Sequence, residues 1–243
     1  GLGDVYKRQI KLIYKVVFFK VIYMHHTESN LIEINNKIKS KINSLSLDQY
    51  NPKVIAVSKT FKEQDILPLL DLGHHDFGEN KVQEALLKWP KLREKYKNVK
   101  LHMLGRLQTN KVKFAVDIFD YIHSLDNLKL ANKLASEIHK KNKKVKMFIQ
   151  INLGGEKQKS GIEPNDLEVF YKNCLSLKLD IVGTMCIPPE DQDPKLFFKE
   201  LLNLNNKIKL PEISMGMTND YLDALEYGST YLRIGTGIFG RRA

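Results

Sequence analysis

Short apolar runs alternate with longer amphipathic stretches along most of this chain. The apolar runs have the length and composition of buried strands, and they lie at residues 53–58, 75–77, 101–104, 121–123, 145–152, 180–185, 212–214 and 231–234. Between them, apolar residues recur at helical spacing, which predicts helices at residues 63–72, 82–88, 127–140, 166–176, 194–206 and 220–227. A further helix is predicted at residues 28–45, where Leu31, Ile34, Ile38 and Ile42 share one face.

This alternation predicts an α/β fold in which crossover helices join parallel strands. Eight strands favour a single closed (β/α)8 TIM barrel over an open sheet, with residues 28–45 as an extra N-terminal helix. No linker or low-complexity stretch divides the chain, so we predict one domain over residues 24–243. In such a barrel the functional site lies at the C-terminal ends of the strands.

Residues 1–23 do not fit the pattern. Their apolar part, residues 10–23, is interrupted by three lysines and is too short to span a bilayer. A basic targeting peptide is one interpretation. The other, which we favour, is that residues 1–23 are a non-native or disordered extension and that Met24 begins the native protein.

Composition narrows the class of protein. Hydrophobic residues make up 42% of the chain and charged residues 28%, as in soluble globular proteins. Two cysteines provide neither a disulfide framework nor a metal site, so we predict a cytoplasmic protein with no membrane partner. The net charge of +11 attracts anions, including phosphorylated ligands, but the lysines are scattered, and we expect no nucleic-acid partner.

Lys59 is the first candidate for chemistry, because it ends an otherwise apolar strand. A lysine at a barrel mouth is partly desolvated, which lowers its pKa and makes its amine nucleophilic toward aldehydes. Taken alone, a strand-end lysine is more often one that simply reaches solvent, and that interpretation stays open. Asn80, just after the next strand, can be a polar group of the site, the cap of the following helix, or both.

Two further clusters, residues 213–220 and 233–240, follow the last two predicted strands. Barrels commonly bind phosphate there, and glycines and small hydroxyl residues expose backbone N–H groups to an anion. Ordinary turn chemistry remains the alternative. His102 lies inside a predicted strand, which favours a core histidine over a catalytic one.

Five motifs together resemble the pyridoxal phosphate homeostasis family, which is related to the N-terminal domain of alanine racemase. They are VSKT (57–60), FGENKVQE (77–84), LGRLQTNK (104–111), SMGMTNDY (214–221) and RIGTGIFG (233–240), and the resemblance runs from about residue 28 to residue 241. Two local departures are Leu101, where tryptophan is common, and the Gly154–Gly155 loop.

The resemblance implies a protein that binds pyridoxal 5′-phosphate (PLP) as an aldimine at Lys59. It would store the cofactor or deliver it to apo forms of PLP-dependent enzymes. Phosphate contacts are implied for Ser214, Gly235 and Thr236, and Arg233 is implied to face the pyridine nitrogen. Asn80 and Met185 would line the cofactor pocket.

We expect a protein with these cofactor contacts to catalyse PLP-dependent reactions only weakly. A carboxylate normally keeps the ring nitrogen of PLP protonated, and an arginine cannot accept that proton. Alanine racemase also has a second domain that supplies a tyrosine base, and we expect that domain to be missing here, because the sequence ends shortly after the barrel motifs. Cys186 is the nearest candidate for a substitute base.

Three alternatives remain open from the sequence. One is a weak PLP-dependent racemase or lyase, and another is an aldolase-type barrel that uses Lys59 without PLP. The third is nucleic-acid binding through the basic surface. We expect a monomer or a weak dimer.

Overall fold

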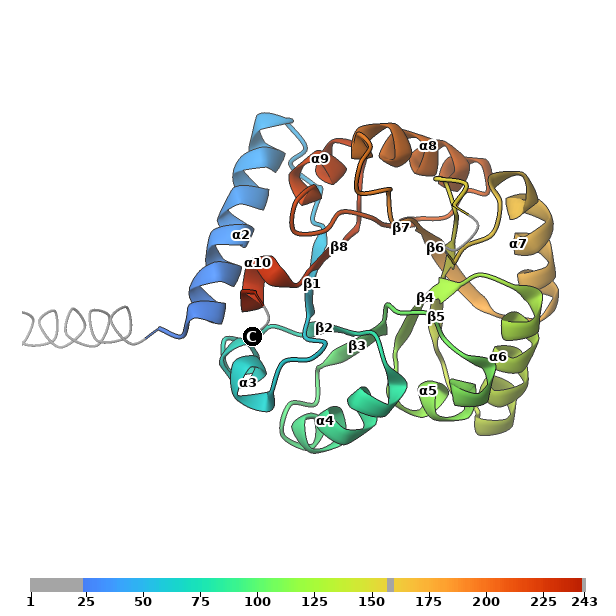
Figure 1. Cartoon of the computed structure of the whole chain (residues 1–243), viewed down its shortest axis with the longest axis horizontal. Helices are drawn as coiled ribbons and strands as arrows, with labels where there is room; N and C mark the ends of the chain where they lie inside the picture. The colour runs from blue at the N-terminus through green and yellow to red at the C-terminus, as the bar shows by residue number, and fades with distance from the viewer. Residues whose placement is uncertain (1–23, 157–159, 242–243) are drawn as a thin grey trace, which may run out of the picture.

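The computed structural model describes residues 24–156 and 160–241, and its eight parallel strands form a closed barrel in chain order (Figure 1). β1 and β8 close the barrel, with Val54 opposite Leu232 and Ile55 opposite Arg233. The predicted barrel is confirmed. Its strands are β1 (Lys53–Val57), β2 (Asp76–Glu79), β3 (Lys100–Met103), β4 (Tyr121–Leu125), β5 (Lys146–Gln150), β6 (Asp180–Met185), β7 (Glu212–Ser214) and β8 (Tyr231–Ile234).

Helices surround the barrel and follow the strands along the chain (Figure 1). They are α2 (His26–Ser44), α3 (Glu63–Asp71), α4 (Val82–Lys95), α5 (Val112–Ile118), α6 (Leu128–Lys141), α7 (Leu167–Ser176), α8 (Pro194–Lys207), α9 (Tyr221–Glu226) and α10 (Thr236–Phe239). Within the described residues, none of the helices has the length and apolar character needed to cross a membrane.

The extra N-terminal helix is α2, which packs against α3, α9 and α10 at the edge of the barrel (Figure 1). A capping box starts it: the His25 side chain accepts from the first turn, and Glu28 accepts from the His25 N–H at 3.0 Å. Leu31, Ile34 and Ile38 form its buried face, as the spacing predicts. The interpretation of residues 1–23 concerns a segment outside the described residues and stays a prediction.

The prediction missed the second half of α4, all of α5 and the four-residue helix α10. α4 continues to Lys95, although the prediction ended it at residue 88, because Trp89 and Leu92 are buried and hold the helix past Pro90. α5 was missed, since it has only seven residues and too few repeats to show a helical period.

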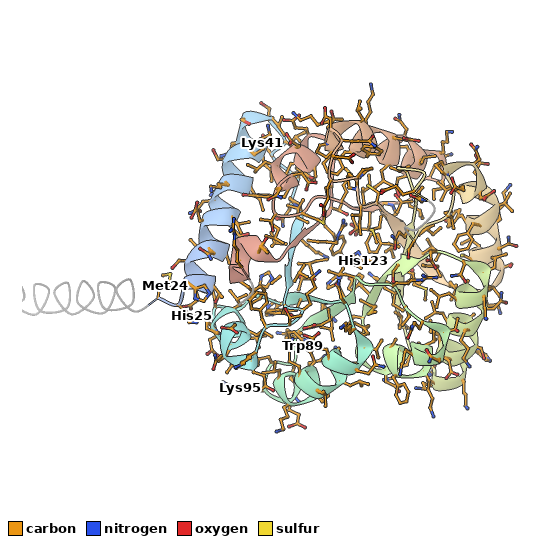
Figure 2. The ribbon with its side chains drawn as sticks, in the orientation of Figure 1. Met24, His25, Lys41, Trp89, Lys95 and His123 are labelled. Carbon is orange, nitrogen blue, oxygen red and sulfur yellow. The ribbon has the colours of Figure 1, made fainter. Side chains whose placement is uncertain are left out.

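The barrel interior is partly polar. An apolar cluster of Ile55, Val57, Tyr121, Phe148, Met185 and Tyr231 fills it together with two fully buried histidines. These are His102 on β3 and His123 on β4, and His123 lies near the middle of the barrel in Figure 2. The larger apolar core lies between the strands and the helices.

Candidate cofactor site

A cavity of about 740 Å³ opens among the loops at the C-terminal ends of the strands. This is where the barrel topology predicts a site, and the volume suits a small organic ligand. Five of the seven residues predicted for the site line this cavity: Lys59, Asn80, Arg233, Gly235 and Thr236. The fold therefore brings most of the predicted site residues to one surface, although they come from the segments after β1 and β2, from β8 and from the segment after β8.

Lys59 leaves the barrel from a turn that two side chains of α4 hold in place. Lys88 Nζ donates to the carbonyl oxygen of Ser58 at 2.9 Å, and the backbone N–H of Thr60 donates to Glu84 Oε1. Thr60 has a φ of 69°, a left-handed conformation that is rare and strained for a β-branched residue. Contacts on both sides of Lys59 thus fix the backbone from which its side chain enters the cavity.

A buried carboxylate, Glu79, lies beneath this turn. Its Oε1 accepts from Ser58 Oγ at 2.8 Å, from Lys88 Nζ at 2.9 Å and from Trp89 Nε1 at 3.0 Å. Its Oε2 has no hydrogen-bond partner among the described residues. Burial raises the pKa of Glu79, while the Lys88 ammonium opposes that shift. Lys88 therefore links the Lys59 turn to a buried charge.

Arg233 brings a buried positive charge to the cavity wall. Its side chain Nη1 donates to Ser214 Oγ and its Nη2 to the carbonyl oxygen of Cys186, both at 2.8 Å. Burial lowers the pKa of Arg233, but an arginine remains protonated at neutral pH. None of the ion pairs within the described part of the chain includes Arg233. Its charge is thus available to a ligand.

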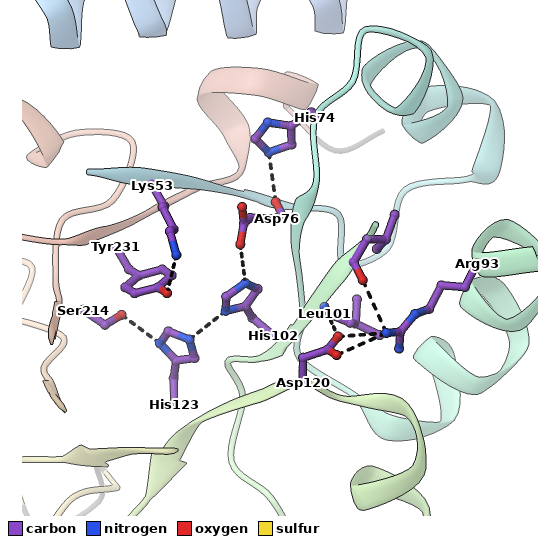
Figure 3. Close-up of polar contacts among 11 residues, drawn as sticks. Lys53, His74, Asp76, Arg93, Leu101, His102, Asp120, His123, Ser214 and Tyr231 are labelled. Atoms are coloured by element: carbon purple, nitrogen blue, oxygen red, sulfur yellow. Dashed lines mark hydrogen bonds and ion pairs between the residues drawn. The ribbon is translucent and has the colours of Figure 1, made fainter. Parts of the chain in front are cut away.

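Ser214 and Met185 lie below the cavity, and neither belongs to its lining. Both are fully buried. The hydroxyl of Ser214 accepts from Arg233 and also lies against His123. Figure 3 shows the second contact, in which His123 Nδ1 is 2.9 Å from Ser214 Oγ. Direct contact of Ser214 with phosphate and of Met185 with the cofactor stays a prediction.

The loops after β7 and β8 meet at Thr218. Thr236 Oγ1 donates to Thr218 Oγ1 at 3.2 Å, and the N–H of Gly237 donates to the same oxygen at 3.2 Å. Two hydroxyls and a glycine-rich backbone therefore converge on one side of the cavity, next to Gly235. Sequence reasoning did not single out Thr218, although its position in SMGMTNDY after the seventh strand was the available signal.

Cys186, the candidate base, is buried directly after β6. Burial raises the pKa of its thiol to about 12, so the thiol is protonated at neutral pH. Its contribution to the site is the backbone carbonyl that accepts from Arg233.

The sequence matches the family of the alanine racemase N-terminal domain over residues 35–243. It is 36% identical over 200 residues to the pyridoxal phosphate homeostasis protein of Aquifex aeolicus, covering 78% of this chain and 87% of that protein. For the protein of the same name in Pasteurella multocida the identity is 35% over 226 residues, covering 88% and 97%. The chain belongs to the pyridoxal phosphate homeostasis protein family.

Solved structures agree with this membership. PipY of Synechococcus elongatus has been solved without PLP and with PLP bound. Its sequence is 31% identical to that of this chain, and the TM-score between the two structures is 0.73. The superposition covers 84% of this chain and 100% of PipY. Alanine racemase of Clostridium difficile, at 14% identity and a TM-score of 0.67, shares the fold over 89% of this chain and 57% of its own length.

Proposed function

We propose that this protein takes part in PLP homeostasis by holding PLP covalently through the Lys59 amine. The observation that carries the proposal is that Lys59, Arg233 and the Gly235–Thr236 loop line a single cavity in a member of this family. PipY, a relative of known structure, has been solved with PLP bound.

The donor set fits the chemical groups of this cofactor. Lys59, which is half-buried at the end of an apolar strand, provides an amine that can react with the aldehyde of PLP. The guanidinium of Arg233 is a cation without a carboxylate contact among the described residues, and it suits an unprotonated ring nitrogen. Hydroxyl and amide groups from Thr218, Gly235 and Thr236 suit a phosphate.

The same residues support storage over catalysis. Bound PLP supplies an electron-withdrawing ring that helps to break bonds in an attached amine, and a protonated ring nitrogen makes that ring effective. Arg233 has no acceptor for this proton, so it does not maintain the protonated form. The thiol of Cys186 is protonated and buried, which argues against a base at that position. A weak racemase or lyase is the second candidate function, favoured by the fold shared with alanine racemase.

A protein that stores PLP can supply it to other proteins only if the bound cofactor can be transferred. We therefore propose apo forms of PLP-dependent enzymes as acceptors, with the amine of the acceptor displacing Lys59. The cavity leaves room for such an amine, because its lining extends beyond the proposed cofactor contacts to Ile187, Pro188, Pro189 and Glu190. Cysteine usage favours the cytoplasm for this exchange. We propose a monomer or a weak dimer.

Reductive trapping tests the proposed attachment. The protein is incubated with PLP, treated with borohydride, digested and analysed by mass spectrometry. We expect one modified peptide that contains Lys59, no such peptide from Lys59→Ala, and normal labelling of Lys81→Ala, which changes an exposed lysine beside Asn80. Labelling spread over many lysines would contradict the proposal. Amino-acid turnover that Lys59→Ala abolishes would favour the racemase or lyase.

A further inference from the structure

A chain of hydrogen bonds runs through the barrel interior from its N-terminal end to the cavity. Asp76, the first residue of β2, has Oδ1 3.0 Å from His102 Nε2. His102 Nδ1 is 3.0 Å from His123 Nε2, and His123 Nδ1 is 2.9 Å from Ser214 Oγ (Figure 3). Ser214 Oγ accepts from Arg233 Nη1 at 2.8 Å. We refer to these five residues as the relay.

The two rings of the relay are held in fixed planes. His102 stacks on Tyr121 with centroids 4.4 Å apart and planes at 12°, and His123 stacks on Phe148 at 4.2 Å and 18°. Both histidines are fully buried. Because the rings cannot turn away, the proton positions on their nitrogens decide which atoms donate and which accept.

The ionised end of the relay sets those proton positions. Burial opposes ionisation of Asp76, but the hydrogen bond with His102 and the charge of Lys53 leave the pKa of Asp76 below its usual value. An ionised carboxylate only accepts, so His102 must carry its proton on Nε2. Burial lowers the pKa of His102 and of His123, so each ring is neutral and holds a single proton.

The remaining directions follow from that single proton per ring. His102 Nδ1 is unprotonated and accepts from His123 Nε2–H. The Nδ1 of His123 is then unprotonated as well, and it accepts the hydroxyl proton of Ser214. With that proton committed, Ser214 Oγ presents lone pairs to Arg233. Every bond in the relay thus points from Arg233 toward Asp76.

The opposite direction is disfavoured at the Ser214 end. If both histidines carried their protons on Nδ1, Ser214 Oγ would accept from His123 and from Arg233 together. Its own proton would then need another acceptor in a fully buried position, and a buried donor without a partner is costly. The acceptor at position 76 and the buried hydroxyl of Ser214 thus favour the same direction, and a residue at position 76 that can only donate would oppose it.

We propose that Asp76 is a positioning residue for Arg233, acting across the barrel through His102, His123 and Ser214. It fixes the proton positions that let Ser214 accept from the guanidinium, and so it fixes how Arg233 faces the cavity. The effect on the cofactor rests on the proposed function, whereas the effect on Arg233 does not.

Three variants separate an acceptor effect from a charge effect. Asp76→Asn removes the charge but keeps an oxygen that can accept from His102. Asp76→Lys offers only donors. Asp180→Lys is the matched control, because it makes the same charge reversal at the first, exposed residue of another barrel strand, β6. If Asp76→Lys does not fold, His102→Phe replaces it, since phenylalanine can stack on Tyr121 and breaks the relay.

The first measurement is ¹⁵N NMR of the histidine and arginine side chains in protein free of PLP. We expect Nε2–H tautomers for His102 and His123 in the wild type, in Asp76→Asn and in Asp180→Lys. In Asp76→Lys we expect His123 to change to Nδ1–H and the Arg233 side-chain signals to shift. Wild-type protein with either histidine as Nδ1–H would overturn the proposal, as would Arg233 signals unmoved in Asp76→Lys.

The second measurement is PLP affinity from absorbance titration. We expect Asp76→Lys to bind PLP about tenfold more weakly, the size of one hydrogen bond to a charged group, while Asp76→Asn and Asp180→Lys bind as the wild type does. Equal affinity of the two lysine variants would refute the link to the cofactor. Wild-type protein that binds no PLP would reject the proposed function, and the NMR result would still decide the role of Asp76.

Discussion

Replacing Lys88 with methionine should cost this protein a large part of its stability. The Lys88 ammonium is within 3.0 Å of Glu79 and Glu84 and also donates to the Ser58 carbonyl. The Glu79 side chain is 0% exposed and that of Lys88 is 9% exposed, so the variant leaves a buried carboxylate without its counter-charge. Removing one partner of a buried pair costs about 3–5 kcal/mol.

The lower end of that range applies here. After the substitution Glu79 still accepts from Ser58 and from Trp89, which compensates part of its charge. We therefore expect the free energy of unfolding to fall by about 3 kcal/mol at pH 7. Urea unfolding followed by circular dichroism measures it, with an unchanged slope as a check on two-state behaviour.

Two controls accompany this variant. Lys37→Met breaks the exposed pair of Lys37 with Glu33, which has the i,i+4 spacing of the pair between Lys88 and Glu84. This control should leave the free energy of unfolding unchanged within error. The double variant Lys88→Met/Glu79→Gln removes both charges and should recover most of the loss. A loss below about 1 kcal/mol for Lys88→Met, the range of exposed ion pairs, would refute the reasoning.

Three further predictions concern the cavity and the barrel interior. Gly105→Ala should weaken PLP binding several-fold in titrations, because a Cβ there would lie 2.4 Å from the backbone oxygen of Asn80; unchanged affinity would show that Asn80 is not needed. Native protein should not react with a thiol reagent at Cys186 at pH 7, since burial raises the pKa of that thiol to about 12, and prompt labelling before unfolding would contradict this. Burial lowers the folded-state pKa of His102 and His123, so below about pH 6.5 the unfolded chain binds protons that the folded chain does not. The free energy of unfolding should therefore decrease as the pH falls, by at most about 1.4 kcal/mol per pH unit for each histidine. Urea unfolding between pH 7 and 5 measures that slope, which should be shallower in His123→Phe; equal slopes would contradict it.

The barrel could be predicted because its signals are local. Each strand is a short apolar run, each long helix has a visible period, and the alternation of the two leaves few topologies. The C-terminal end of α4 could not, because burial of Trp89 against the barrel overrides Pro90. The short helices α5 and α10 could not either, because seven and four residues are too few to show a period.

The site could be predicted in part for a related reason. Residues that directly follow strands, such as Lys59 and Asn80, necessarily meet at one end of a barrel. The relay could not be predicted, because it depends on which interior residues of non-adjacent strands face each other. His123 is an inconspicuous member of a predicted strand, and only the closed barrel brings it to Ser214.

The most direct test of the account is the visible absorbance of the purified protein with added PLP, for the wild type and for Lys59→Ala. A covalent link between the Lys59 amine and the PLP aldehyde predicts a yellow wild-type protein whose visible band disappears on borohydride reduction, and a Lys59→Ala variant without that band. A wild-type protein that PLP cannot colour, or a variant that is coloured equally, would contradict the account.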